Sequence, residues 1–383
     1  MQVLLVGCGG YAAGYVKELL TGEGVLGLKL TGIVDPYAKN SPAYALIAQK
    51  AIPVFDTVDE FYARHTADLA VVSTPIFLHH EQALACLAHG SHLLLEKPMA
   101  ATVAQAEDIV KAAQQSGRKL GVGFQQCYDP VMLAVKDEID QGLLGAPVSQ
   151  RGLILWPRPK AYYARSGGWA GKKVLPDGRP VYDSILTNAT AHYLLSMLWL
   201  TTKGYDAQPA AACEAQLGRA YPIETFDTIA ARYTLACGTT AMLYFSHALH
   251  YDKVPRLLME YVFEDATIRV AQTKGYVYKV TGTDHHGRVK TYGMLTAAYR
   301  HKLTGMRRAI AEGAPLTCPA QTGMASMISN AMVFANDLTD VETIRPVRED
   351  DTGIWSPGLA DRLRAAFKAG KLPREMGQTL SGT

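Results

Sequence analysis

The chain has 383 residues, of which 48% are hydrophobic and 19% are charged, and its formal net charge is +3. This is an ordinary globular composition, and the length predicts two domains, each with its own core. The charges form no basic stripe, so nucleic acid is not an expected partner. No apolar run approaches the roughly 20 residues of a membrane helix. The apolar start also ends too early for a signal peptide, so we expect no membrane partner and a cytoplasmic location.

The first 124 residues alternate between short apolar runs and helical patterns. Six such runs, separated by helices, predict a parallel sheet covered on both faces, the doubly wound arrangement of an α/β domain. The expected strands lie at 3–6, 28–34, 52–55, 69–73, 92–95 and 120–124, and the expected helices at 11–20, 42–50, 58–64, 78–89 and 103–116.

The pattern changes after residue 124. Residues 125–350 predict an α+β domain with an open, mainly antiparallel sheet, and residues 351–383 form a C-terminal tail with one helical stretch at 359–368. The irregular stretch 157–181 is long enough to suggest a functional loop. Helices are expected at 130–141, 184–200 and 299–336, the last broken near 313–315, and strands at 147–156, 225–235, 239–246, 256–263, 267–272 and 276–281.

A glycine-rich turn, Gly7-Cys8-Gly9-Gly10-Tyr11-Ala12, follows the first strand and opens the first helix. Gly7 permits a tight turn, Gly9 lets a pyrophosphate approach the backbone, and Ala12 keeps helix and strand close. The helix N-terminus then offers N–H groups to the phosphates. We therefore predict that this segment, Gly10 and Tyr11 included, binds a dinucleotide. The alternative is a doubly wound domain that binds none.

The second strand ends at an acidic residue, Asp35. A carboxylate there can accept hydrogen bonds from the ribose hydroxyls and repels a 2′-phosphate, which favours NAD over NADP. Asp35 lies farther from Gly7 than the roughly 20 residues that are usual. Because Lys39 is close in sequence, NADP stays open as the cofactor.

Two motifs follow the fourth and fifth strands: Thr74-Pro75-Ile76-Phe77-Leu78-His79 and Glu96-Lys97-Pro98. With the glycine turn, they resemble the glucose–fructose oxidoreductase / inositol dehydrogenase / rhizopine-catabolism (Gfo/Idh/MocA) family. The resemblance covers the first domain and extends, more weakly, to about residue 250. It implies a nicotinamide cofactor and oxidation of a hydroxyl on a sugar or cyclitol, or the reverse reduction.

The resemblance also implies roles for residues at these strand ends, where ligands bind in such sheets. Lys97 would donate to the reacting oxygen, with the bond before Pro98 cis; the alternative is an ordinary surface lysine. Glu96 would contact the cofactor or pair with Lys97. His79 would lie in the cleft near the cofactor or be merely structural. The cofactor is also expected to contact Ser73, Thr74 and Pro75.

In the second domain, the family places an aspartate four residues before a histidine on one helix. This chain has Asn188 and His192 there, and the i, i+4 spacing puts both on one helical face. His192 fits a general base that takes the hydroxyl proton as hydride leaves; the alternative is a core histidine. Asn188 departs from the pattern, since an amide can orient the imidazole but cannot raise its basicity. Asp183 is a possible substitute carboxylate.

Further candidates for substrate contact lie at the domain junction and in the long loop. Gln125 can bond the nicotinamide amide or a sugar hydroxyl, whereas Cys127 stands where relatives often carry an arginine. Tyr162, Tyr163 and Trp169 resemble the family's aromatic segment and can stack on a sugar or simply pack the loop. The six cysteines are scattered without a C-x-x-C pair, which predicts free thiols and no metal site.

The sequence therefore predicts an NAD(P)-dependent dehydrogenase that acts on a ring hydroxyl of a sugar or cyclitol. Two alternatives stay open: a glycoside-cleaving enzyme that oxidises the sugar transiently, and a non-catalytic NAD-binding sensor. The family also implies a homodimer or homotetramer.

Overall fold

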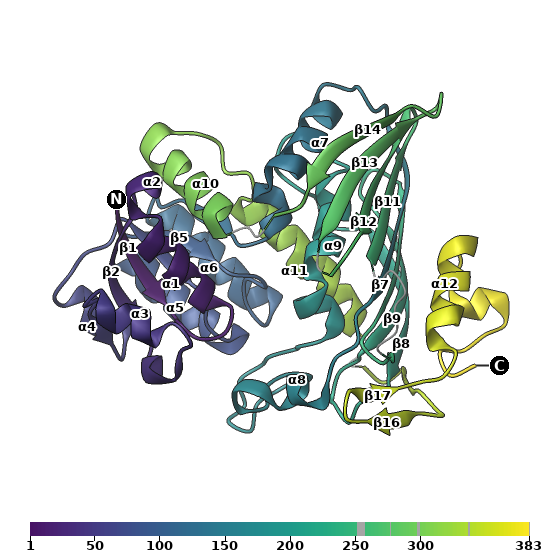
Figure 1. Ribbon diagram of the computed structural model, residues 1–383, viewed down its shortest axis with the longest axis horizontal. Coiled ribbons are helices and arrows are strands. Elements are labelled where there is room, and N and C mark those ends of the chain that lie inside the picture. The colour runs from purple at the N-terminus through teal and green to yellow at the C-terminus, as the bar shows by residue number, and fades with distance from the viewer. Residues whose placement is uncertain (251–256, 276, 297–298, 336–337, 383) are drawn as a thin grey trace. The chain divides into compact units, whose positions relative to one another are not determined.

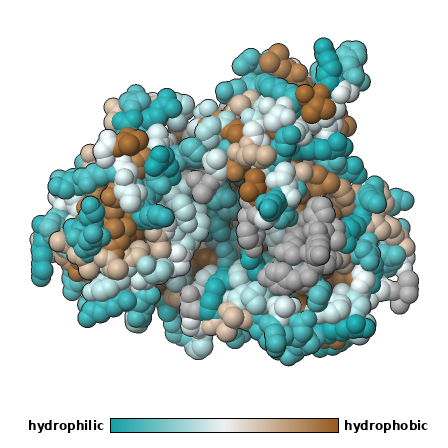
Figure 2. Space-filling model, in the orientation of Figure 1, coloured by the Kyte–Doolittle hydropathy of each residue, from teal (hydrophilic) through white to brown (hydrophobic). Residues whose placement is uncertain are grey.

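The computed structural model describes residues 1–250, 257–275, 277–296, 299–335 and 338–382. The chain forms two compact units, Met1–Asp129 with Ala297–Met324, and Pro130–Thr296 with Ala325–Thr383. The expected ends at residues 256, 276 and 336 fall outside the described residues. Figure 2 shows hydrophilic residues over much of the visible surface and hydrophobic residues in smaller groups, as in ordinary globular proteins. Of the helices described, none is long and apolar enough to cross a membrane.

The first unit contains the expected parallel sheet, in the order β3-β2-β1-β4-β5-β6. Its strands are almost fully buried because their residues are apolar on both faces. The strand order reverses between β1 and β4, the point at which such sheets bind ligands. The strands are β1 (Gln2–Val6), β2 (Lys29–Val34), β3 (Val54–Phe55), β4 (Leu69–Val72), β5 (His92–Leu95) and β6 (Leu120–Val122).

Helices cover this sheet, and one of them comes from much later in the chain. Helix α10 (Tyr299–Glu312) buries Leu303 and Met306 in the same core cluster as Leu5 and Val16. Residues 297–324 therefore pack with the first unit. The other helices are α1 (Ala12–Thr21), α2 (Glu23–Leu26), α3 (Tyr44–Gln49), α4 (Val58–Tyr62), α5 (His79–Ala88) and α6 (Val103–Gln115).

The second unit is built on a nine-stranded sheet in the order β14-β13-β12-β11-β7-β10-β9-β8-β15. Most neighbours are antiparallel; β7 with β10 and β8 with β15 are parallel. This confirms the open, mainly antiparallel sheet. The strands are β7 (Pro147–Leu155), β8 (Ala212–Arg219), β9 (Thr228–Thr234), β10 (Thr240–Ser246), β11 (Leu257–Phe263), β12 (Ala266–Gln272), β13 (Tyr278–Asp284), β14 (Val289–Met294) and β15 (Val341–Thr343).

Two helices lie on opposite faces of this sheet (Figure 1). On one face, Ser196 of α9 (Ala191–Trp199) bonds the hydroxyl of Tyr261 in β11 at 2.6 Å. On the other, Leu363 and Phe367 of α12 (Leu359–Ala369) share a core cluster with Tyr244 of β10. The helix predicted in the tail is thus present and covers the sheet. The unit also contains α7 (Pro130–Asp140), α8 (Lys160–Ala164) and the end of α11 (Ala320–Phe334).

Candidate cofactor and catalytic site

The glycine turn between β1 and α1 has the shape of a phosphate cradle. Gly7 has a φ of 89°, and a Cβ there would lie 2.7 Å from the carbonyl oxygen of Ser73. Gly9 and Gly10 are exposed, and a Cβ at either would meet no atom within 4 Å. Their backbone N–H groups have no acceptor among the described residues. Open space lined by unpaired amides at a helix N-terminus fits the pyrophosphate of a dinucleotide.

Asp35 is tied to this turn. Its Oδ2 accepts hydrogen bonds from the Cys8 backbone N–H at 2.9 Å and from the Cys8 thiol at 3.3 Å, and its Oδ1 accepts from the Tyr37 N–H at 2.9 Å. Burial, reinforced by Asp35, raises the pKa of Cys8 to about 12, so the thiol stays a donor. A carboxylate has roughly four acceptor positions. One is therefore left for a ribose hydroxyl.

A buried histidine joins the loops that follow β4 and β5. The Nδ1 of His79 lies 2.8 Å from the carbonyl oxygen of Pro98, and its Nε2 lies 2.9 Å from that of Thr74. Burial lowers the pKa of His79, and a neutral imidazole donates only one of these bonds. Both ring nitrogens thus face the backbone. The cofactor contacts of His79, Ser73 and Pro75 stay predictions, and any effect of His79 would be exerted through the two loops.

A buried ion pair joins the residue that follows β5, Glu96, to helix α10. The Glu96 carboxylate accepts hydrogen bonds from the Tyr15 hydroxyl at 2.7 Å and from the ammonium of Lys302, whose side chain is 0% exposed. Burial alone would raise the pKa of Glu96, but Lys302, together with Tyr15 and Lys97, lowers it, and the net shift is downward. Rings of Tyr11, Tyr15 and Tyr299 surround the ammonium at 4.9, 4.8 and 5.6 Å.

This arrangement gives Glu96 a buried partner that the sequence did not indicate. Its bond to Lys97 comes from that residue's backbone N–H, at 3.2 Å, and its buried ion partner is Lys302. Lys97 itself is half-buried, and its bond to Pro98 is cis, as the resemblance implies. The sequence did not indicate Lys302, because nothing in a helical pattern shows which lysine a distant carboxylate will draw into the core.

Gln125, expected near the nicotinamide, lies close to the glycine turn. The Tyr11 hydroxyl is 3.4 Å from its Oε1, a long contact at an exposed position. Cys127 is buried, and none of the six cysteines forms a disulfide. The first unit thus places Gly7 beside Thr74 and Tyr11 beside Gln125. Contact of these residues with a cofactor stays a prediction.

The second unit differs from expectation just before α9. Residues Ile185–Ala189 form a π-helical turn, and α9 begins only at Ala191. The expected single α-helix over 184–200 is therefore wrong at its start, and so is the idea that Asn188 and His192 share one α-helical face. The cause is local: Ser184 and Thr187 form a capping box, and the Thr190 N–H bonds the Ile185 carbonyl oxygen at 3.0 Å, a five-residue step.

Asn188 is instead held by the candidate substitute carboxylate. Its Nδ2 donates to Oδ1 of the buried Asp183 at 2.8 Å, and the other oxygen of Asp183 accepts from the Gly171 N–H at 2.7 Å. His192 is half-buried in the first turn of α9. Asp183 therefore fixes Asn188 rather than standing free, and the roles of all three residues in binding or catalysis stay predictions.

The aromatic segment is also built into this unit. The hydroxyl of Tyr163 lies 3.0 Å from Nδ1 of the buried His247, and the Tyr163 ring packs on Tyr221 at 4.8 Å. Trp169 is buried beside the guanidinium of Arg165, at 5.1 Å. No role was predicted for His247, which directly follows β10 in the chain. Substrate contact by Tyr163 and Trp169 is untested by this geometry.

Comparison with known proteins bears on the first unit most directly. Residues 1–124 match the model of the GFO_IDH_MocA family, described as an oxidoreductase family with an NAD-binding Rossmann fold. Residues 1–124 therefore form a domain of the Gfo/Idh/MocA oxidoreductase family. The match covers the glycine turn, Asp35 and the Glu96-Lys97-Pro98 motif, and it identifies the first unit as an NAD(P)-binding Rossmann domain.

Curated relatives match only part of this chain. An inositol 2-dehydrogenase of Rubrobacter xylanophilus is 31% identical over 153 residues, 40% of this chain and 43% of that protein. A glycosyl hydrolase family 109 protein of Shewanella amazonensis is 29% identical over 159 residues, 38% of this chain and 33% of that protein. The matched segments thus span less than half of either relative.

Solved structures extend the likeness to both units of the fold. The WlbA dehydrogenase of Bordetella pertussis, solved in complex with NADH and UDP-GlcNAcA, superposes with a TM-score of 0.70. It covers 91% of this chain and 99% of its own, at 21% identity. At that identity the likeness establishes the fold of the second unit and leaves its ligand to be argued from its own residues.

Proposed function

We propose that this protein is an NAD-dependent dehydrogenase that oxidises a ring hydroxyl of a sugar or cyclitol, or catalyses the reverse reduction. The observation that carries the proposal is the open cradle at Gly9 and Gly10 beside the tethered carboxylate of Asp35. The inositol 2-dehydrogenase relative supports the substrate class. NAD, when bound, supplies the hydride acceptor.

Two side chains are proposed to act on the reacting hydroxyl, one on its proton and one on the charge that develops on its oxygen. His192 takes the hydroxyl proton as a general base, and Lys97 donates a hydrogen bond to the same oxygen and stabilises charge that develops there. Asn188, fixed by Asp183, orients the base or bonds a second hydroxyl. Gln125, Tyr163 and Trp169 are assigned to substrate binding, with Gln125 able to reach the nicotinamide as well.

A turnover assay tests this proposal. Purified protein is mixed with NAD and a panel of inositols, sugars and glycosides, and both NADH and product sugars are measured. Lys97→Ala and His192→Ala should each lower kcat by about 10²- to 10⁴-fold, while the exposed-site controls Lys111→Ala and His285→Ala leave it unchanged. Full activity in both site variants would refute the catalytic assignment.

A second candidate function is cleavage of a glycoside through transient oxidation of its sugar. The replacement of the family's aspartate by Asn188 and the likeness to a glycosyl hydrolase family 109 protein favour it. In the same assay this enzyme releases product sugar without net NADH. Tight NAD binding without any turnover would instead indicate a sensor.

Cofactor choice is part of the proposal. Asp35 has one acceptor position left for a ribose hydroxyl and would repel a 2′-phosphate, so we expect NAD to bind more tightly than NADP. Asp35→Ala should reduce the ratio of the Kd for NADP to the Kd for NAD about tenfold, as measured by cofactor titration. Equal affinity of the unaltered protein for both cofactors would contradict it.

Oligomeric state and cellular location also stay proposals. Helix α12 already covers β7 and β10 on one face of the sheet. Pairing of two copies through that face would therefore involve α12 itself or the strands beyond it. Light scattering in solution tests the expected homodimer or homotetramer, and fractionation of cells tests the expected cytoplasmic location.

A further inference from the structure

Two arginines in the loop after β7 lie against one aromatic ring. The guanidinium carbon of Arg158 is 4.8 Å from the ring centroid of Tyr162, and that of Arg165 is 3.5 Å from it. Both arginines are half-buried, and among the described residues neither forms an ion pair. Two like charges held near one ring repel each other, so the cluster favours an anion that the described residues do not supply.

Two buried carboxylates that act on the neighbouring Tyr163 already accept hydrogen bonds from other groups. Asp183 accepts from Asn188 and Gly171. Asp227, which is fully buried, accepts from the backbone N–H groups of Ala220 and Tyr221 at 2.8 Å. These bonds direct both carboxylates toward the protein's own amides, so the arginines are left to bind an external partner.

Neutral donors lie next to the two cations. His247 is 1% exposed and its Nδ1 lies 3.0 Å from the Tyr163 hydroxyl, while its Nε2 has no hydrogen-bond partner among the described residues. Burial first, and then Arg158 and Arg165, lower the pKa of His247 well below its ordinary value, so the ring is neutral and Nε2 can carry a proton. Within the part of the chain that the structure describes, the buried Nε1 of Trp169 also lacks a hydrogen-bond partner. Buried donors without acceptors are costly, and an anion would satisfy them.

This cluster adjoins the segment that carries His192. The guanidinium of Arg158 lies 5.8 Å from the Trp156 ring, and that ring packs edge-on against Tyr193 at 5.7 Å. Tyr193 is the direct neighbour of His192 in α9. The arginines therefore lie within a few side chains of the proposed general base, on its own unit.

We propose that Arg158 and Arg165 form a subsite for an anionic substituent of the substrate, a carboxylate or a phosphate, assisted by N–H donors of His247 and Trp169. Arginine suits both groups, because its planar guanidinium binds their oxygens in pairs. The inference rests on the proposed function, since it names which class of sugar that site accepts. The two arginines would also supply positive charge to a chain that has Cys127 where relatives often carry arginine.

Binding measured by calorimetry at saturating NADH tests the subsite. The ligands are D-glucuronate, D-glucose 6-phosphate and neutral D-glucose. At least one anion should bind about tenfold or more tightly than glucose. Arg158→Met and Arg165→Met should each remove about that advantage, whereas Arg288→Met, at a side chain that is 79% exposed, should not. Arg158→Lys and Arg165→Lys keep the positive charge and should retain part of the tighter anion binding. They test the subsite even if a Met variant fails to fold.

The outcomes separate the possibilities. The preferred anion identifies the substituent as carboxylate or phosphate. Equal or tighter binding of glucose, no binding of either anion, or anion binding that is unchanged in both Met variants would overturn the subsite. Arginine-dependent anion binding without hydride transfer would refute the proposed function but support the subsite. Turnover of neutral sugars alone would support the proposed function but refute the subsite.

Discussion

The side-chain amide of Asn188 donates a hydrogen bond to the buried carboxylate of Asp183 at 2.8 Å. The family pattern has an aspartate at this position. In this chain the carboxylate is that of Asp183, just before the π-helical turn, and it lies beside Asn188. Asn188→Asp would place two carboxylates in contact, so we expect a loss of about 2 kcal/mol in the free energy of unfolding at pH 8. The pair would bind a proton more tightly when folded, so the loss should shrink toward pH 5.

The exchange Asp183→Asn with Asn188→Asp is the control for that change. It reverses donor and acceptor but restores one amide and one carboxylate, and the new amide oxygen can still accept from the Gly171 N–H. Urea denaturation at both pH values should show recovery of most of the lost stability. If the double variant is no more stable than Asn188→Asp, the hydrogen bond between residues 183 and 188 does not stabilise the π-helical turn.

The buried pair of Glu96 and Lys302 predicts strong coupling. Glu96→Gln leaves an ammonium without its charge partner, and Lys302→Met leaves a carboxylate, so each should cost about 3–5 kcal/mol of stability. The double variant removes both charges and should cost clearly less than the sum. A double-mutant cycle by urea denaturation measures this coupling. Additive losses would show that the two charges do not depend on each other.

Asp227 predicts a dependence of stability on pH. Burial raises the pKa of Asp227 to about 6, although bonds from Tyr221, Ala220 and Thr228 oppose the shift. The folded protein therefore binds a proton that the unfolded chain has lost above about pH 4. This group's contribution favours folding at low pH and is lost as pH rises through 6, by about 3 kcal/mol in total.

Asp227→Asn isolates that contribution. Its amide can accept from the two backbone N–H groups and donate to the hydroxyl of Thr228. Relative to the unaltered protein, the variant should therefore gain stability between pH 4 and pH 7, measured by denaturation across that range. A difference that stays constant with pH would contradict the raised pKa.

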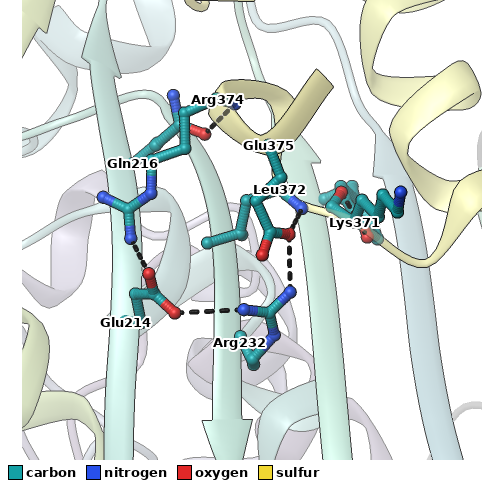
Figure 3. A network of polar contacts seen from close by, with 8 residues as sticks. Glu214, Gln216, Arg232, Lys371, Leu372, Arg374 and Glu375 are labelled. Carbon is teal, nitrogen blue, oxygen red and sulfur yellow. Dashed lines mark hydrogen bonds and ion pairs between the residues drawn. The ribbon is translucent and has the colours of Figure 1, made fainter. Parts of the chain in front are cut away.

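The tail that carries α12 is held to the sheet in two ways. Figure 3 shows Arg232 of β9 between Glu214 and Glu375, with Arg374 bonded to Glu214 as well. These groups are partly exposed, so their pairs stabilise little. Phe367 is 6% exposed, and its replacement by Ala should cost about 3 kcal/mol. Thermal unfolding should show a much smaller fall in Tm for Arg232→Ala than for Phe367→Ala.

The sequence predicted the first unit well because its signals are local. Each strand is a short apolar run buried on both faces, and the turn at Gly7 is a backbone feature that only glycine accommodates beside Ser73. The order of the motifs then placed Asp35, Thr74 and Lys97 at strand ends. No knowledge of distant contacts was needed for those positions.

The second unit and the buried charges depended on contacts that spacing does not encode. Strand β14 has no buried residue, so it lacks the alternation that marks a half-buried strand. Lys302 and His247 owe their burial to partners far away in the chain. The π-helical turn before α9 depends on the hydroxyls of Ser184, Thr187 and Thr190, which an apolar helical pattern does not reveal.

Isotope transfer tests most directly whether hydride passes from a ring carbon of a sugar or cyclitol to NAD. Protein in molar excess over NAD is mixed with perdeuterated inositol, glucose and glucuronate in separate reactions, and the cofactor is analysed by mass spectrometry. We predict deuterated NADH with at least one substrate, formed about 10²- to 10⁴-fold more slowly by His192→Ala. Tight NAD binding with no deuterium in the cofactor from any substrate would contradict the claim.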